Sequence, residues 1–79
     1  MNYIEKELFT KEQAEYNKTK SNSILIIGID TFDYTYKTFR CEPNSVDNKL
    51  KTIYNKDVWV DVIAILDLTK DFENAEVKA

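Results

Sequence analysis

The side chains that most often carry catalysis are scarce in this chain, which has no histidine and a single cysteine. Histidine is the commonest group that exchanges protons near neutral pH. Cys41 would act as a nucleophile only with a base beside it to lower its pKa, and that task would fall to Arg40 or a lysine. We therefore expect a non-enzymatic protein, with a structural Cys41 and no cofactor.

Clustered carboxylates are the second group that could do chemistry, because they bind Mg²⁺ or Ca²⁺. Four aspartates lie near the ends of apolar segments: Asp30, Asp33, Asp61 and Asp67. Their spacing matches no calcium-binding loop, and exposed turn and edge positions explain them equally well. We expect no metal site, and a metal-dependent hydrolase or nuclease is the least favoured alternative.

Aromatic residues interleaved with polar and basic ones between residues 32 and 40 are the nearest feature to a recognition motif: Phe32, Tyr34, Tyr36, Lys37, Phe39 and Arg40. Aromatic side chains on an open sheet, flanked by bases, stack nucleobases in several nucleic-acid-binding modules. The same alternation buries one face of an ordinary hairpin. Because the net charge is −3, we favour a core or protein interface, and keep a single-stranded nucleic-acid-binding module using residues 32–40 as the alternative.

Two apolar runs rich in β-branched residues must position these side chains, and they predict strands at residues 24–29 and 58–68. Residues 32–37 predict a further strand, which forms an antiparallel hairpin with residues 24–29 and turns near Asp30 and Thr31. Gly28 has no neighbouring glycines of a phosphate-binding loop, so we expect it to allow a β-bulge or the close approach of a side chain.

Two helices are predicted beside the strands. Residues 10–13 match a capping box with Thr10 as N-cap and Gln13 reaching back to it, which predicts a helix from about Thr10 to Lys20 with Phe9 packed on Ala14. Residues before it either join that helix or form a short edge strand. Apolar residues at helical spacing predict a second helix from Ser45 to about Asn55. Residues 1–9 and 71–79 are expected to be loosely ordered.

These elements predict a single small α+β domain over residues 1–79, with a three-stranded, mostly antiparallel sheet, a β-β-α-β core and a weak N-terminal helix. The expected strand order is second, first, last. The second helix would cover the sheet face that carries Val58, Val60, Val62, Ala64 and Leu66. The opposite face of the last strand would lack cover, and an uncovered apolar face is usually a contact surface.

The sequence therefore predicts a small interaction protein that binds a larger protein or a second copy of itself. The expected partner-binding residues are Tyr34, Tyr36, Trp59, Asp61, Ile63, Ile65 and Asp67. Residues 57–79 carry six acids against Lys70 and Lys78, and this acidity favours a basic partner surface and disfavours nucleic acid.

Asn, Lys, Ile and Tyr make up 30 of the 79 residues, a bias typical of AT-rich genomes. Small proteins of this composition are frequent in phages and mobile elements, so we expect an accessory protein that inhibits a host or defence protein. The first residues do not resemble a secretory signal, and no apolar stretch approaches the ~20 residues of a membrane span. These features predict a cytoplasmic protein without membrane contact.

Overall fold

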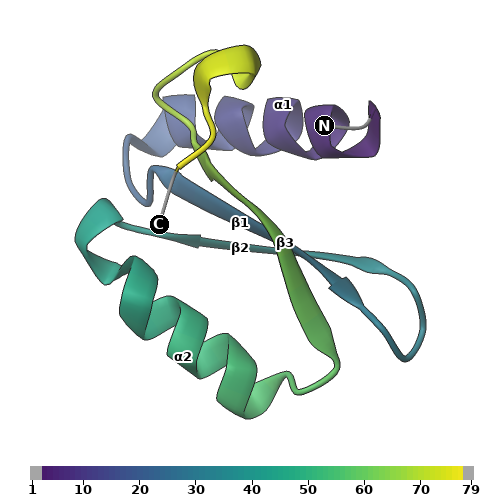
Figure 1. Cartoon of the computed structure of the whole chain (residues 1–79). Helices are drawn as coiled ribbons and strands as arrows, with labels where there is room; N and C mark the ends of the chain where they lie inside the picture. The colour runs from purple at the N-terminus through teal and green to yellow at the C-terminus, as the bar shows by residue number, and fades with distance from the viewer. Residues whose placement is uncertain (1–2, 78–79) are drawn as a thin grey trace.

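The computed structural model describes residues 3–77, which form a three-stranded sheet with one helix on each face (Figure 1). The helices and strands are α1 (Tyr3–Thr19), β1 (Ile24–Asp30), β2 (Tyr36–Cys41), α2 (Val46–Lys56) and β3 (Val60–Asp67). Residues 3–77 also include two short 3-10 helices, η1 (Pro43–Ser45) and η2 (Phe72–Asn74). Within residues 3–77, no helix is both long enough and apolar enough to cross a membrane.

The central strand of the sheet is β1, which pairs antiparallel with both β2 and β3. The strand order β2-β1-β3 confirms the predicted order and the α+β fold. Because β1 has a neighbour on each side, β2 and β3 are the two edges of the sheet, and α2 connects them across one face (Figure 1).

Alternate side chains of β1 enter two separate apolar cores. Leu25 and Ile27 point toward α1, and their cluster includes Phe9 of that helix. Ile24 and Ile26 point toward α2 and cluster with Ile53. This arrangement explains why residues 24–27 are all apolar: a strand that is covered on both faces needs no polar side.

Helix α1 begins at Tyr3, so the predicted start at Thr10 is wrong. Thr10 lies inside the helix, where its hydroxyl donates to the Lys6 carbonyl at 2.9 Å. The amide of Gln13 donates to the carbonyls of Leu68 and Lys70, at 3.0 and 2.8 Å, and does not reach back to cap the helix. Tertiary contacts that the local pattern does not contain therefore extend the helix toward the N-terminus.

Phe9 shows the origin of this extension. It was expected to pack on Ala14, but it is buried in the core and its ring lies 5.4 Å from that of Phe72, centroid to centroid. Residues 3–9 therefore belong to α1 and form no edge strand. Of the two ends expected to be loosely ordered, residues 1–2 and 78–79 lie outside the described residues.

Strand β2 spans residues 36–41, so the predicted strand at residues 32–37 is shifted. Ile29 pairs with Tyr36, and the residues between Asp30 and Tyr36 form the connecting loop. Phe32 and Tyr34 therefore lie in a loop and not on the sheet. The helix predicted after this strand is confirmed within about one residue at each end as α2.

A β-bulge interrupts β3, which is shorter than the predicted 58–68 strand. Ile27 pairs with Ala64 but Gly28 pairs with Val62, so Ile63 is an extra residue. The bulge moves the following side chains to the opposite face: Val62 packs in the α2 cluster, Ala64 and Leu66 pack in the α1 cluster, and Ile65 packs in the α2 cluster. The predicted uninterrupted alternation along this strand is wrong.

Candidate protein-interaction surface

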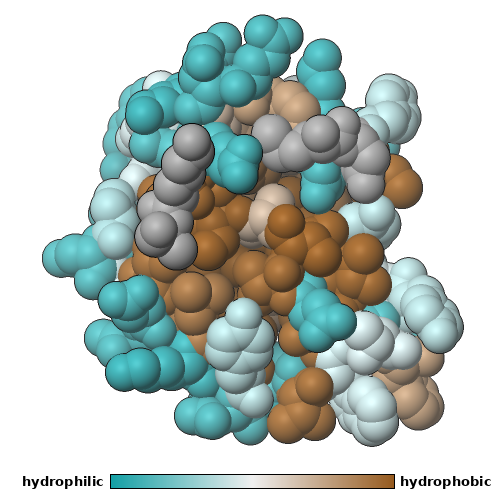
Figure 2. All heavy atoms as spheres, in the orientation of Figure 1, coloured by the Kyte–Doolittle hydropathy of each residue, from teal (hydrophilic) through white to brown (hydrophobic). Residues whose placement is uncertain are grey.

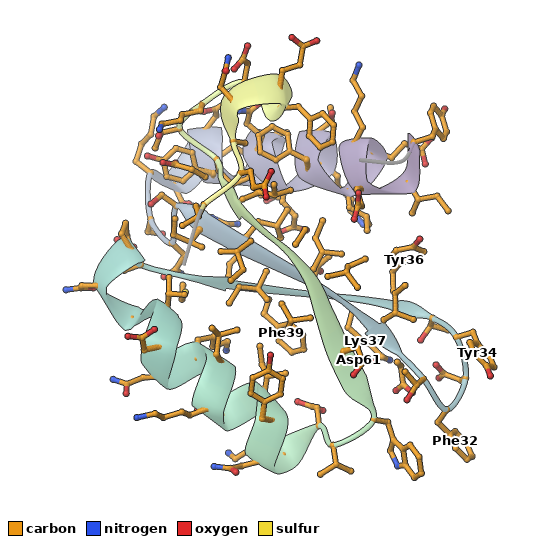
Figure 3. The ribbon with its side chains drawn as sticks, in the orientation of Figure 1. Phe32, Tyr34, Tyr36, Lys37, Phe39 and Asp61 are labelled. Atoms are coloured by element: carbon orange, nitrogen blue, oxygen red, sulfur yellow. The ribbon has the colours of Figure 1, made fainter. Side chains whose placement is uncertain are left out.

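Large apolar side chains are exposed at one end of the sheet, where the β1–β2 loop meets the start of β3. We call this group the aromatic tip; its members are Phe32, Tyr34, Val58 and Trp59, which are 74%, 80%, 71% and 58% exposed. Figure 3 shows Phe32 and Tyr34 at the end of the hairpin, pointing away from the sheet. Exposed aromatic groups that gather in one place are typical of contact surfaces.

Two contacts join the loop to the residue before β3. The rings of Phe32 and Trp59 lie 5.7 Å apart, centroid to centroid, at an interplanar angle of 49°. Thr31 donates two hydrogen bonds to the Trp59 carbonyl, from its backbone N–H at 2.7 Å and from its hydroxyl at 2.8 Å. Phe32 and Trp59 are therefore held together, although they are far apart in sequence.

Side-chain caps order the loop itself. The Asp30 carboxylate accepts the Phe32 N–H at 2.8 Å, and the Asp30 carbonyl accepts the Tyr34 N–H at 2.7 Å. The Asp33 carboxylate accepts both the hydroxyl and the N–H of Thr35, at 2.6 and 3.1 Å. These bonds, the hydroxyl bond first, lower the pKa of Asp33. The loop is thus ordered before any partner binds, which reduces the entropy cost of binding.

Tyr34 adopts a left-handed backbone conformation, with φ of 59°. For residues other than glycine this conformation costs about 1–2 kcal/mol, and it is uncommon for a bulky side chain. No packing need explains a tyrosine here, because its side chain is 80% exposed. Strained residues cluster at functional sites, so this residue supports a binding role for the loop.

A second candidate surface is the outer side of β3, which we call the β3 edge and define as residues 60–64. The next residues of β3 are covered by the C-terminal segment: Asp67 N–H donates to the Ala75 carbonyl at 2.7 Å, and Val77 N–H donates to the Ile65 carbonyl at 2.9 Å. A groove lies along residues 62–66 and is closed by Glu76 and Val77. Figure 2 shows apolar side chains gathered on the face in front of β3, between the two helices.

The structure divides the predicted partner-binding residues among three environments. Tyr34 and Trp59 belong to the aromatic tip, and the exposed Asp61 and Ile63 lie on the β3 edge. The other three predicted residues, Tyr36, Ile65 and Asp67, make contacts within the fold. Trp59, Ile63 and Ile65 therefore do not share one uncovered sheet face, and that prediction is wrong.

Tyr36 is half-buried against the α1 cluster, and Ile65 is half-buried against the α2 cluster. The Asp67 carboxylate accepts the N–H and the hydroxyl of Thr69, at 2.9 and 2.6 Å, and so orders a turn. The sequence places Phe32 only in the alternative nucleic-acid-binding motif, and it places Val58 on the covered face of the last strand, so neither is among the predicted partner-binding residues. The signal that could have placed Phe32 in an exposed loop is the pair of Asx-type turn residues around it, Asp30 and Asp33.

The aromatic residues of the hairpin do not form one stacking platform. Tyr36 packs toward α1 and Phe39 packs toward α2, so these two rings lie on opposite faces of the sheet (Figure 3). Arg40 donates to the carbonyls of Asn22 and Ser21, at 3.1 and 2.6 Å, and its guanidinium is thereby committed within the fold. Both features disfavour the single-stranded nucleic-acid reading.

The carboxylates and the cysteine considered for chemistry do not form one cluster in the described residues. Across residues 3–77, no group of three His, Cys, Asp or Glu side chains is placed to hold a metal ion. Cys41 is buried, and burial raises the pKa of its thiol, so the reactive thiolate is disfavoured. Comparisons of the chain with protein-family models, with curated proteins and with solved structures found no match.

Proposed function

We propose that this chain is a non-enzymatic interaction protein that binds a larger protein through the aromatic tip. The observation that carries the proposal is the combination of exposure and order at the tip. Phe32 and Trp59 are exposed but held in contact, and the loop between β1 and β2 is fixed by the Asp30 and Asp33 caps. Rigid aromatic anchors of this kind supply much of the affinity at protein interfaces.

The charges around the tip favour a basic partner surface. Four aspartates lie within the two segments that build the tip or beside them: Asp30, Asp33, Asp57 and Asp61. A lysine or arginine of the partner would gain from these carboxylates and from the faces of the exposed rings. Acidic residues of this sort also speed the encounter with a basic surface.

Within this class, we favour an accessory protein of a phage or mobile element that inhibits a host or defence protein by covering part of its surface. The AT-rich amino-acid bias supports this assignment. Covering a surface requires no catalytic group, in keeping with the chain's lack of histidine. The competing hypothesis is that a second copy of the chain binds the aromatic tip and forms a homodimer.

The test compares variants of the tip with matched variants elsewhere. The full chain is immobilised and exposed to lysates of candidate bacterial hosts, and captured proteins are identified by mass spectrometry. A specific partner should be lost by Phe32→Ala and by Trp59→Ala but retained by Tyr54→Ala, since Tyr54 is 55% exposed on α2. Truncation of an aromatic hot spot costs about 2 kcal/mol or more, so the loss should be clear.

Two results would contradict the proposal. One is capture that is equally strong for the wild type, the two tip variants and Tyr54→Ala. The other is a concentration-dependent dimer, seen by sedimentation, that the tip variants abolish while no host protein is captured. Circular dichroism of each variant provides the folding control.

A further inference from the structure

We infer that the β3 edge binds an extended segment of the partner, rich in basic and apolar residues, as an added strand of the sheet. The inference rests on the proposed function, since it assigns a binding mode to a protein partner. It concerns a different surface. The aromatic tip consists of residues in the β1–β2 loop and just before β3, whereas the β3 edge is the outer side of β3 along residues 60–64.

The backbone of the β3 edge has hydrogen-bonding groups available. The Trp59 carbonyl faces β1, where it accepts the Thr31 N–H. In an antiparallel ladder successive residues point their backbone groups to opposite sides, so Val60 and Val62 direct theirs away from β1. The Val60 N–H already donates to the Asp57 carbonyl at 2.8 Å, so the Val60 carbonyl and the two backbone groups of Val62 are the ones that a partner segment would meet. In the part of the chain that the structure describes, no strand pairs with that side of residues 60–64.

The chain itself shows that this side of β3 accepts a strand. The segment around Glu76 forms an antiparallel bridge with Leu66, flanked by the hydrogen bonds of Val77 to Ile65 and of Asp67 to Ala75. A partner segment would continue this pairing toward the start of β3. Added strands of this kind gain affinity from main-chain bonds and specificity from alternate side chains.

The side chains of the groove define the chemistry of the segment. The lining residues between positions 62 and 66 are apolar, and Ile63 is 40% exposed. The exposed carboxylates of Asp61 and Glu76 lie toward the two ends of this apolar stretch. A segment with apolar residues at its centre and lysine or arginine beside Asp61 and Glu76 matches this pattern.

A second copy of the chain matches it less well. Pairing two β3 edges would bring the Asp61 and Glu76 carboxylates of both copies to one junction, and like charges across strands are destabilising. The bulge at Ile63 and the acidic Asp61 are also features that protect edge strands from self-association. Because of these two features, only a short stretch of β3 can pair with an added strand. Such a stretch suits a peptide segment better than the whole β3 edge of a second copy.

The experiment titrates the ¹⁵N-labelled full chain with a capped heptapeptide that has valines at its centre and lysines at its two ends, and NMR spectra record the amide shifts. The expected result is saturable shifts of the amides in residues 60–64, with smaller changes in residues 31–35. A heptapeptide of the same sequence that is N-methylated at every amide should bind at least about tenfold more weakly, because it lacks main-chain donors. Asp61→Lys should weaken binding of the unmodified peptide, whereas Asp47→Lys on α2 should not.

Three results would overturn the inference. They are the absence of shifts at millimolar peptide, equal binding of the N-methylated peptide, and shifts at residues 60–64 that follow protein concentration without peptide. The last would assign the edge to a second copy. Phe32→Ala and Trp59→Ala should leave peptide binding intact, so a failure of the aromatic tip and a failure of the β3 edge are distinguished.

Discussion

Val60 occupies the space that a side chain on Gly28 would need. A Cβ added at residue 28 would lie 2.5 Å from Cγ1 of Val60 and 3.1 Å from the carbonyl oxygen of Asp61. Gly28 is also the residue at which the β1–β3 register shifts. The only glycine of the chain is therefore fixed by its neighbours across the sheet, as the sequence predicted for a bulge or a close approach.

Gly28→Ala is accordingly expected to lower the free energy of unfolding by about 1–3 kcal/mol, the usual cost of overpacking. Urea denaturation followed by tryptophan fluorescence measures this change. The double variant Gly28→Ala/Val60→Ala should lose less stability than the sum of the two single variants, since removing Cγ1 relieves the contact. Additive losses would show that the contact with Val60 is not the cause.

Tyr34→Gly is expected to raise the free energy of unfolding by up to about 1 kcal/mol, because glycine adopts positive φ without strain. Partner binding should fall at the same time, since an exposed ring of the aromatic tip is lost. Lys20→Gly is the matched control: Lys20 also has positive φ, at 55°, but lies at the end of α1. Lys20→Gly should also raise the free energy of unfolding, but it should leave partner binding unchanged. Equal binding by Tyr34→Gly would remove Tyr34 from the contact surface.

Asp33 should make the stability of the folded loop depend on pH in the acidic range. Its pKa is lowered by the bonds from Thr35, so the ionised form is favoured in the folded loop. The stability that ionised Asp33 gives the fold is present above the Asp33 pKa of the unfolded chain. It is lost as the pH falls through the lower pKa of the folded state. A carboxyl-carbon NMR titration should show the Asp33 pKa rising toward its usual value in Thr35→Val. An unchanged pKa in that variant would contradict the assigned cause.

Cys41 should react slowly with a thiol reagent in native buffer. Burial raises the pKa of the thiol, which keeps it protonated, and also restricts access of the reagent. Reaction with Ellman's reagent near pH 8 should therefore be slow without denaturant and fast in urea. Because the folded pKa is the higher one, stability should also decline as the pH rises past the unfolded pKa. Immediate reaction of the native protein would show that Cys41 is accessible.

The apolar runs were sufficient to predict the sheet, because a strand such as β1, apolar on both faces, has few places in a small fold other than the centre. Gly28 indicated a bulge or a close approach, but the apolar pattern did not show that the extra residue would be Ile63 of β3. The register of β3 shifts opposite Gly28, where Val60 packs closely, and these two residues are far apart in the sequence. The start of α1 likewise depends on the packing of Phe9 against Phe72.

The candidate surface was predictable in part. The sequence predicts Tyr34 and Trp59 as contact residues on a sheet face. The structure instead places Tyr34 in the hairpin loop (Figure 3) and Trp59 just before β3, joined to that loop by Thr31. The alternation of residues 32–37 is compatible with a strand, and the Asp30 and Asp33 caps make it a loop instead. The hydrogen bonds of Thr31 to Trp59 link distant positions, so no local pattern reveals them.

The central position of β1 makes this small protein suited to fragment complementation. Every β-ladder of the sheet includes β1, and its two neighbours do not pair with one another. Cutting the chain in the loop of residues 31–35 would leave α1 and β1 on one fragment, and β2, α2 and β3 on the other. Neither fragment contains a complete sheet, so structure would return only when the first inserts its strand between the two edges of the second.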